Sequence, residues 1–188
     1  MNLQTNQKVI IRLAKPEDEP KIINIQYSSL KVLAAKDYNY AQMKALLRSK
    51  STPRKSPETI FVAEINGITV GFASLLHSLN MIGAVFVDPS FTRRSIGTLL
   101  LKKIEQEATS KKIPVLWVYS SLTGYNFYKA NGYRTIEKTY LPLYSTYVPC
   151  IKMKKRLLPI SYREVILEII QLNIALLIIA IAILSWSI

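Results

Sequence analysis

Residues 85–100 read Val85-Phe86-Val87-Asp88-Pro89-Ser90-Phe91-Thr92-Arg93-Arg94-Ser95-Ile96-Gly97-Thr98-Leu99-Leu100. An apolar run typical of a strand ends in a loop, and a helix begins near Ser95. Backbone N–H groups at a helix start point the same way as the positive end of the helix dipole, and Gly97 allows a ligand to approach the backbone closely. The segment therefore predicts an anion site suited to a pyrophosphate, to which Arg93 and Arg94 add charge. Taken alone, the same residues fit an ordinary strand-to-helix turn with solvated arginines equally well.

The helix after this loop has apolar residues at helical spacing. Its predicted core positions are Ile96, Leu99, Leu100, Ile104 and Ala108. Lys102, Lys103 and Glu105 are predicted to face outward.

The elements around this segment alternate between strand and helix patterns. Residues 59–65 and 68–76 are rich in β-branched side chains and flank Asn66-Gly67, a pair favoured in type I′ hairpin turns, so they predict a β-hairpin. Further strands are predicted at residues 9–13, 82–87 and 114–118, from Gly132 onward, and at 147–153. Four helices are predicted: one that begins at Pro16, one around Met43 to Leu47, one that begins near Ser95, and one at 121–130. Residues 51–57 are predicted to be a loop. This order predicts one mixed α/β domain.

Composition limits the classes of function. The chain has 188 residues, 49% of them hydrophobic, and a formal net charge of +13, so it supports a folded core and favours an anionic partner. Nucleic acid, a phosphorylated ligand and an acidic membrane surface are the candidates, but no nucleic-acid motif is present and we do not expect that partner. One cysteine, Cys150, and one histidine, His77, exclude an intrachain disulfide and a Cys/His zinc cluster.

The C-terminal segment differs in character from the rest. Residues 169–188 carry no charge, and a helix of this length spans about 30 Å, the thickness of a bilayer's hydrocarbon core. We expect a single-pass membrane anchor that leaves the folded part in the cytoplasm, because a basic flank precedes it. That flank is Lys152, Lys154, Lys155, Arg156 and Arg163. The alternative is a helix packed on the domain or on a second copy. The polar residues 1–7 do not resemble a secretory signal.

The segment at 85–100 resembles the acetyl-CoA loop of the GCN5-related N-acetyltransferases, the GNAT superfamily, and is close to the version in bacterial N-terminal acetyltransferases of ribosomal proteins. The usual pattern is Gln or Arg, two residues, Gly, one residue, then Gly or Ala. Here those places hold Thr92, Ser95 and Gly97, so two of the three depart from the pattern. A serine hydroxyl at the second place is itself able to donate to phosphate.

A second match lies about thirty residues downstream. Residues 127–133 read Phe127-Tyr128-Lys129-Ala130-Asn131-Gly132-Tyr133 and resemble the family's Phe-Tyr, three residues, Gly-Phe/Tyr signature. The resemblance implies that Tyr128 is the general acid toward the leaving thiolate. The alternative is a core aromatic, because Leu122, Tyr125 and Tyr128 share one helical face. The family's common asparagine seven residues before this tyrosine is Ser121, which the resemblance places beside the pantetheine arm.

The resemblance covers roughly residues 9–157 and implies a mixed, mostly antiparallel sheet flanked by about four helices. It implies a gap between the strands that end at Val87 and Val118, where the backbone of Val85 and Val87 pairs with the pantetheine amides. The implied cofactor-binding residues are Val85, Val87, Arg93, Arg94, Ser95, Ile96, Gly97, Thr98 and Ser121. No metal is implied. The expected organisation is an acetyltransferase domain at 1–157, a basic linker at 158–164 and a transmembrane anchor at 165–188.

The implied activity is transfer of an acetyl group from acetyl-CoA to a primary amine of a small molecule, protein or peptide, by direct attack at a membrane surface. The strand at 82–87 contains no carboxylate, so the general base stays open between a water relay and a set of side chains. That set is Glu58, Glu64, His77 and Asp88. The acceptor and the oligomeric state also stay open. The alternatives are an acyl-CoA-binding protein without catalysis and a basic interaction module.

Overall fold

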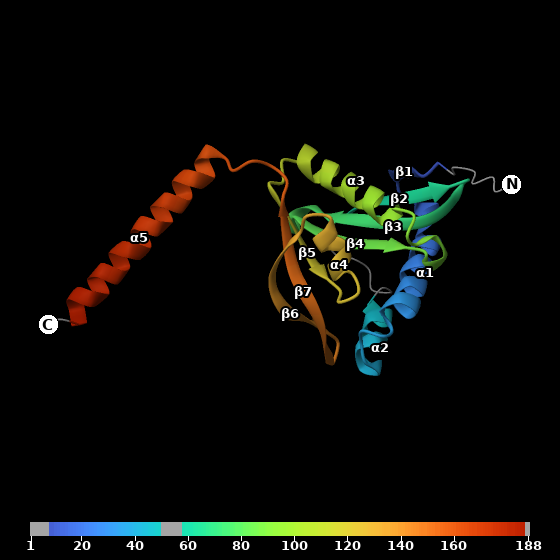
Figure 1. Ribbon diagram of the computed structural model, residues 1–188, viewed down its shortest axis with the longest axis horizontal. Helices are drawn as coiled ribbons and strands as arrows, with labels where there is room; N and C mark the ends of the chain where they lie inside the picture. The colour runs from blue at the N-terminus through green and yellow to red at the C-terminus, as the bar shows by residue number, and fades with distance from the viewer. Residues whose placement is uncertain (1–7, 50–57, 187–188) are drawn as a thin grey trace. The chain divides into compact units, whose positions relative to one another are not determined.

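The computed structural model describes residues 8–49 and 58–186 (Figure 1). The predicted loop at 51–57 and the polar residues 1–7 lie outside the described residues. The chain divides into two compact units, Met1–Leu157 and Leu158–Ile188. Each unit is described below by itself.

The first unit has the predicted alternation of elements. Its strands are β1 (Ile10–Leu13), β2 (Glu58–Ile65), β3 (Ile68–Leu76), β4 (Met81–Val87), β5 (Val115–Ser120), β6 (Arg134–Leu143) and β7 (Thr146–Arg156). Its α-helices are α1 (Glu19–Ser29), α2 (Tyr40–Ser49), α3 (Ile96–Ser110) and α4 (Tyr125–Ala130). Short helical turns are η1 (Pro16–Asp18), η2 (Leu30–Ala34), η3 (His77–Leu79) and η4 (Pro89–Phe91). Residues 121–124 form a turn before α4, so the predicted helix at 121–130 is correct only in its second half.

The seven strands form one sheet in the order β1-β2-β3-β4-β5-β7-β6. Neighbouring strands are antiparallel except β4 and β5, which are parallel. The predicted hairpin of β2 and β3 is confirmed, and Asn66 and Gly67 take φ values of 51° and 78°, as a type I′ turn requires. Among the described residues, β4 and β5 pair at Met81 and Trp117 and then diverge (Figure 1).

Helix α3 covers one face of the sheet and α1 the opposite face. Helix α3 contributes Ile96, Leu100 and Ile104 to the core on its face of the sheet. On the opposite face, Ile25 of α1 packs with Val62 and Phe72. Strand residues alternate between these faces because successive side chains point to opposite sides. The mixed sheet with four flanking helices is therefore as predicted.

Two assignments on α3 were wrong. Leu99 is 39% exposed, and Leu101, at 1%, takes the core position in its place. Glu105 does not face outward, because its carboxylate accepts two hydrogen bonds of 2.8 Å from Lys155 Nζ of β7. A strand that lies beside the helix supplies this cation, which helical periodicity alone does not reveal.

An ionic cluster joins β1, η1, β2 and β3. Both terminal nitrogens of Arg12 donate to the buried Asp18 carboxylate at 2.7 and 3.0 Å, and Arg12 Nε donates to Glu64 at 2.8 Å. The backbone N–H of Lys15 and the hydroxyl of Thr69 also donate to Asp18. The guanidinium of Arg12 is the largest of these influences, and together they lower the pKa of Asp18 to about 2.

The predicted basic flank is mostly part of the sheet. Strand β7 continues to Arg156, three residues beyond its predicted end, so Lys152, Lys154 and Lys155 belong to the domain. Lys154 pairs in register with Trp117 of β5, and Arg156 with Val115. Of the five basic residues assigned to the flank, Arg163 alone follows the first unit.

The second unit contains helix α5 (Tyr162–Trp186). Its span Val165–Ile183 has a mean hydropathy of 2.6 and is long and apolar enough to cross a membrane by length and composition. The helix begins three residues before the predicted start of the anchor.

Candidate functional site

A gap with unpaired backbone opens between β4 and β5. Asp88 N–H donates to Val70 O of β3 at 2.9 Å, and hydrogen-bonding groups alternate sides along a strand. Val85 and Val87 therefore direct their N–H and C=O groups away from β3 and toward the gap. The described β5 residues do not pair with them. The Val87 carbonyl accepts one hydrogen bond from the buried hydroxyl of Ser29 at 2.7 Å and retains a second lone pair.

The loop at the open end of this gap has the geometry of an anion site. Arg93 and Ser95 take positive φ values of 63° and 58° on either side of Arg94, which does not. Alternation of left- and right-handed residues turns successive N–H groups toward one point. Helix α3 starts immediately afterwards without a side-chain cap, so its first N–H groups have no partner within the helix. Thr98 belongs to this first turn.

The two predicted motifs meet at Gly97. A Cβ at this position would lie 3.3 Å from Phe127 Cε2 and 3.7 Å from Val87 Cγ2. The missing side chain therefore lets the start of α3 pack against α4, which is a different reason for glycine than the predicted approach of a ligand. The loop and the Phe-Tyr motif are held in one place by this contact.

Tyr128 is 7% exposed and belongs to the main core cluster. Its ring makes edge contacts with Phe127 and Tyr133 at centroid distances of 5.1 and 5.4 Å. Burial raises the pKa of the Tyr128 hydroxyl above its usual value, so this hydroxyl keeps its proton at neutral pH. Leu122, predicted to share its buried face, lies in the turn before α4 and is 37% exposed.

Ser121 lies in the turn that leads from β5 to α4. Its hydroxyl accepts a hydrogen bond from Gly124 N–H at 3.0 Å, and the next N–H, that of Leu122, donates to the Tyr38 hydroxyl at 2.8 Å. Tyr38 is 7% exposed, so it packs and fixes this turn. Ser121 thus stands directly after the end of β5, and its contact with the pantetheine arm stays a prediction.

All four side chains considered as the base have interaction partners. Glu64 is bound by Arg12, the Asp88 carboxylate accepts from Ser90 N–H at 3.0 Å, and His77 Nε2 lies 2.6 Å from the Thr59 hydroxyl. The fourth, Glu58, reaches β4.

Glu58 reaches β4 because Gly83 has no side chain. A Cβ on Gly83 would lie 2.9 Å from Glu58 Oε1 and 2.7 Å from Ser74 Oγ. The pairing of β3 with β4 steps from Ala84 to Ile82, which leaves Gly83 in a β-bulge. Sequence reasoning missed this position, although a glycine inside a strand pattern is a signal for a bulge.

Other reactive groups do not join the site. Cys150 is buried in β7, and burial raises the pKa of its thiol, which disfavours the thiolate. The described residues contain no group of three or more His, Cys, Asp or Glu side chains arranged to hold a metal ion.

Comparisons with known proteins agree with this architecture. Residues 24–157 match the family model of the acetyltransferase (GNAT) domain. An uncharacterised N-acetyltransferase of Escherichia coli K12, YafP, is 28% identical over 132 residues, which cover 68% of this chain and 83% of that protein.

Solved structures of N-acetyltransferases have a similar fold. The crystal structure of a GCN5-related N-acetyltransferase from Rhodopseudomonas palustris is 25% identical, covers 81% of this chain and 99% of its own, and superposes with a TM-score of 0.74. The PaiA N-acetyltransferase of Thermoplasma acidophilum, solved with coenzyme A, has the same fold at 21% identity, with 79% and 99% of the two chains covered and a TM-score of 0.62.

The match covers more than half of the chain, and the β4–β5 gap with the α3 start fits a donor that carries a pyrophosphate and an amide arm. The chain therefore belongs to the GNAT family and is an acetyl-CoA-dependent N-acetyltransferase.

Proposed function

We propose that this protein transfers the acetyl group of acetyl-CoA to a primary amine at a membrane surface, with Tyr128 as general acid. The observation that carries the proposal is the gap between β4 and β5, with two backbone positions facing it and an anion-binding loop at its open end. The acyl donor supplies an activated thioester to this gap. The protein supplies orientation and proton transfer.

The donor is held by the residues that the sequence predicted. Backbone groups of Val85 and Val87 face the gap, and Ser121 stands at its other wall. The N–H groups of Ser95, Ile96, Gly97 and Thr98 bind the pyrophosphate, with Arg93 and Arg94 beside them. Arg93, Arg94 and Ser95 are exposed, so their charge and hydroxyl are available to a ligand.

The proton balance assigns one role to Tyr128. An ammonium first loses a proton to water or to a basic group, and the neutral amine forms the C–N bond while the C–S bond breaks. The departing sulfur takes the proton of Tyr128, and the proton that the nitrogen still has to lose restores Tyr128. One proton is released overall. The raised pKa of Tyr128 keeps this proton in place throughout the physiological range.

The membrane part of the proposal rests on Val165–Ile183 alone. The predicted basic flank no longer supports it in full, because Lys152, Lys154, Lys155 and Arg156 are in β7. Arg163, at the start of α5, remains as the residue that orients the helix with the catalytic domain in the cytoplasm.

Binding and turnover of the full-length protein in detergent micelles test the catalytic part. We expect one-site binding of acetyl-CoA in a calorimetric titration, and acetyl transfer to at least one member of a panel of amines and peptides. Tyr128→Phe should retain donor binding and lose about 10²- to 10⁴-fold in kcat. Donor binding without transfer to any acceptor, unaffected by Tyr128→Phe, would instead identify an acyl-CoA-binding protein without catalysis.

Flotation with liposomes tests the membrane part. The full-length chain should float, and Leu177→Arg, in the middle of the apolar span, should reduce flotation because a charge at the bilayer centre costs about 2.5–3.5 kcal/mol on insertion scales. Tyr162→Arg places the same charge outside the span and is the matched control. Equal flotation of the two variants would argue against a transmembrane helix.

A further inference from the structure

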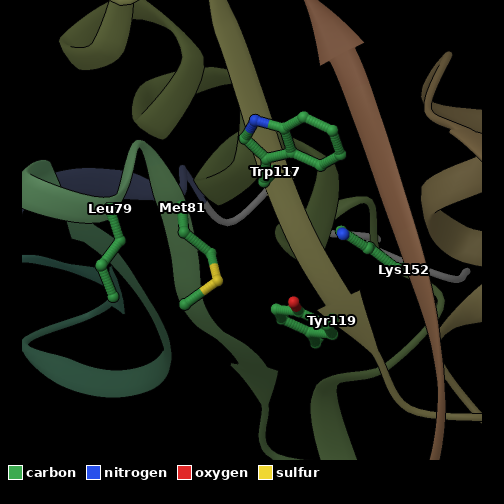
Figure 2. A pocket seen from close by; sticks show the side chains of 5 residues that line it. All are labelled: Leu79, Met81, Trp117, Tyr119 and Lys152. Atoms are coloured by element: carbon green, nitrogen blue, oxygen red, sulfur yellow. The ribbon is translucent and has the colours of Figure 1, made fainter. Parts of the chain in front are cut away.

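An apolar pocket lies at the closed end of the β4–β5 gap. It has a volume of about 230 Å³ and is lined by Leu79, Met81, Trp117, Tyr119 and Lys152. Figure 2 shows the Met81 side chain extending toward Tyr119, and the Lys152 amine pointing toward the space between the two aromatic rings. A cavity of about 150 Å³ holds benzene in other proteins, so this volume admits an aryl-sized group.

The pocket opens on the face of the sheet opposite α3. Leu116 and Val118 of β5 pack in the cluster that contains α3, so Trp117 and Tyr119, which alternate with them, point to the other face. Met81 and Trp117 are the residues at which β4 and β5 pair. A molecule in this pocket therefore reaches the gap from the face opposite the α3 start.

A carboxylate lies between the pocket and the backbone that faces the gap. Along β4 the order is Met81 in the pocket, Gly83 in the bulge, then Val85 with its backbone toward the gap. Gly83 is exposed, and a Cβ on Gly83 would lie 2.9 Å from Glu58 Oε1 and 2.7 Å from Ser74 Oγ, so the carboxylate stands over this glycine beside the Ser74 hydroxyl. An ammonium group above Gly83 would thus meet a negative charge two residues along β4 from Val85, whose backbone faces the gap.

Two cations and one further carboxylate lie around the Trp117 side of the pocket. Lys152 and Lys154 stand 5.4 and 5.3 Å from the Trp117 ring centroid, and Glu137 pairs with Lys152 at 3.3 Å. Lys152 lines the pocket and Lys154 lies on the Trp117 ring, so this group keeps a net positive charge after the Glu137 pair is counted, which disfavours a second ammonium group on a bound molecule. The chain's net charge of +13 acts in the same direction.

We propose that the acceptor is a small primary monoamine with an aryl or similarly compact apolar group, which occupies the Met81–Trp117–Tyr119 pocket while the Glu58 carboxylate holds the ammonium. This proposal rests on the proposed function and names its substrate class. It excludes diamines and polyamines as preferred acceptors. It also makes Glu58 a specificity-determining residue.

Acetyl transfer by the full-length protein to three probe amines tests the proposal. At saturating acetyl-CoA, kcat/KM for 2-phenylethylamine should exceed the values for ethylamine and for 1,4-diaminobutane by at least about tenfold, because filling an apolar pocket contributes 10- to 200-fold. A peptide with an N-terminal phenylalanine serves as a fourth probe. It carries the same apolar group on a longer chain.

Variants assign the effect to individual side chains. Tyr119→Ser should reduce the preference for 2-phenylethylamine over ethylamine about tenfold, whereas Ile136→Ser, at a strand position of similar exposure on β6, should leave it unchanged. Glu58→Gln should raise KM for 2-phenylethylamine about tenfold with a smaller change in kcat. Glu17→Gln makes the same charge change at an exposed position outside the site and is the control.

Fluorescence gives a readout that does not depend on turnover. The chain has two tryptophans, so in a Trp186→Phe background the emission reports Trp117 alone. Addition of 2-phenylethylamine in the presence of coenzyme A should change this emission saturably, and 1,4-diaminobutane should not.

Three results would each overturn the proposal: equal kcat/KM for all three amines, no change in Trp117 emission, or a higher kcat/KM for the peptide than for 2-phenylethylamine. None of them would contradict the N-acetyltransferase activity itself. Donor binding with no transfer to any probe would instead count against the proposed function.

Discussion

Replacement of Ser95 by glycine tests the geometry of the anion-binding loop. Ser95 has φ = 58° and ψ = 9°, in the left-handed region, where a residue with a Cβ is destabilised by about 1–2 kcal/mol relative to glycine. Glycine gains more freedom in the unfolded chain, which offsets about 0.5–1 kcal/mol. The net expectation for Ser95→Gly is a gain of about 0.5–1 kcal/mol in the free energy of unfolding.

The gain should appear as a rise of about 1–4 °C in Tm, from the scaling of Tm with stability for a domain of this size. Thermal unfolding of the full-length protein, followed by circular dichroism, measures it. Lys112→Gly is the matched control, because exposed Lys112 also has φ = 58° and lies beyond the other end of α3. Both glycine variants should gain similar stability.

Acetyl-CoA titrations then separate the backbone from the hydroxyl. Ser95→Ala keeps the left-handed strain and removes the hydroxyl, so its Tm should stay close to that of the wild type. If the hydroxyl donates to phosphate, Ser95→Ala and Ser95→Gly should both weaken binding about tenfold or more, and Lys112→Gly should not. A fall in Tm for Ser95→Gly together with a rise for Lys112→Gly would refute the assignment of strain at Ser95.

Three further outcomes follow from individual contacts. Gly97→Val should destabilise the protein by about 1–3 kcal/mol and weaken acetyl-CoA binding, because the added atoms meet the Phe127 ring at about 3.3 Å; unchanged thermal unfolding would contradict this packing. Asp18→Asn should cost about 2 kcal/mol at pH 7 and remove the part of the acid-induced loss of stability that Asp18 contributes. The folded pKa of Asp18, about 2, lies below its ordinary value of 3.8, so its contribution is present above the unfolded pKa and is lost as pH falls through the folded pKa. An unchanged loss of stability between pH 5 and pH 2 in the variant would contradict this. Tyr133→Phe should leave the free energy of unfolding unchanged or raise it by up to about 1 kcal/mol, because the buried Tyr133 hydroxyl has no hydrogen-bond partner within the described structure. Urea unfolding measures this difference. A loss above about 1 kcal/mol would mean that the nearby Glu105 carboxylate accepts a hydrogen bond from the Tyr133 hydroxyl.

Local patterns predicted most of the elements because their causes are local. Asn66-Gly67 specifies its turn through the positive φ of both residues, and the spacing of Ile96, Leu100 and Ile104 specifies the buried face of α3. The resemblance of two motifs was sufficient for the family. Leu99 was predicted to be buried, whereas Leu101 is the buried residue. Both leucines lie at the edge of the apolar face of α3, and only the elements that pack against the helix decide which of the two is covered.

Contacts between distant residues decided the rest. The sequence shows no reason for the Phe127 ring to lie against Gly97, for Glu58 to reach over Gly83, or for Lys155 to bind Glu105, because each pair is brought together by strand order and register. The basic residues of β7 show the same effect: their sequence favoured a membrane flank, whereas pairing with β5 and β6 places them in the sheet.

The sequence by itself determined the α/β class, the acetyltransferase family and the apolar C-terminal segment, since periodicity, turn chemistry and short motifs are properties of consecutive residues. The family resemblance implied a gap between these two strands, but only the tertiary structure decided that their pairing stops at Met81 and Trp117, which carboxylate lies over Gly83 and which aromatic side chains line the pocket. These depend on the register of strands that are far apart in the chain, and a shift of one residue would turn Trp117 and Tyr119 to the opposite face.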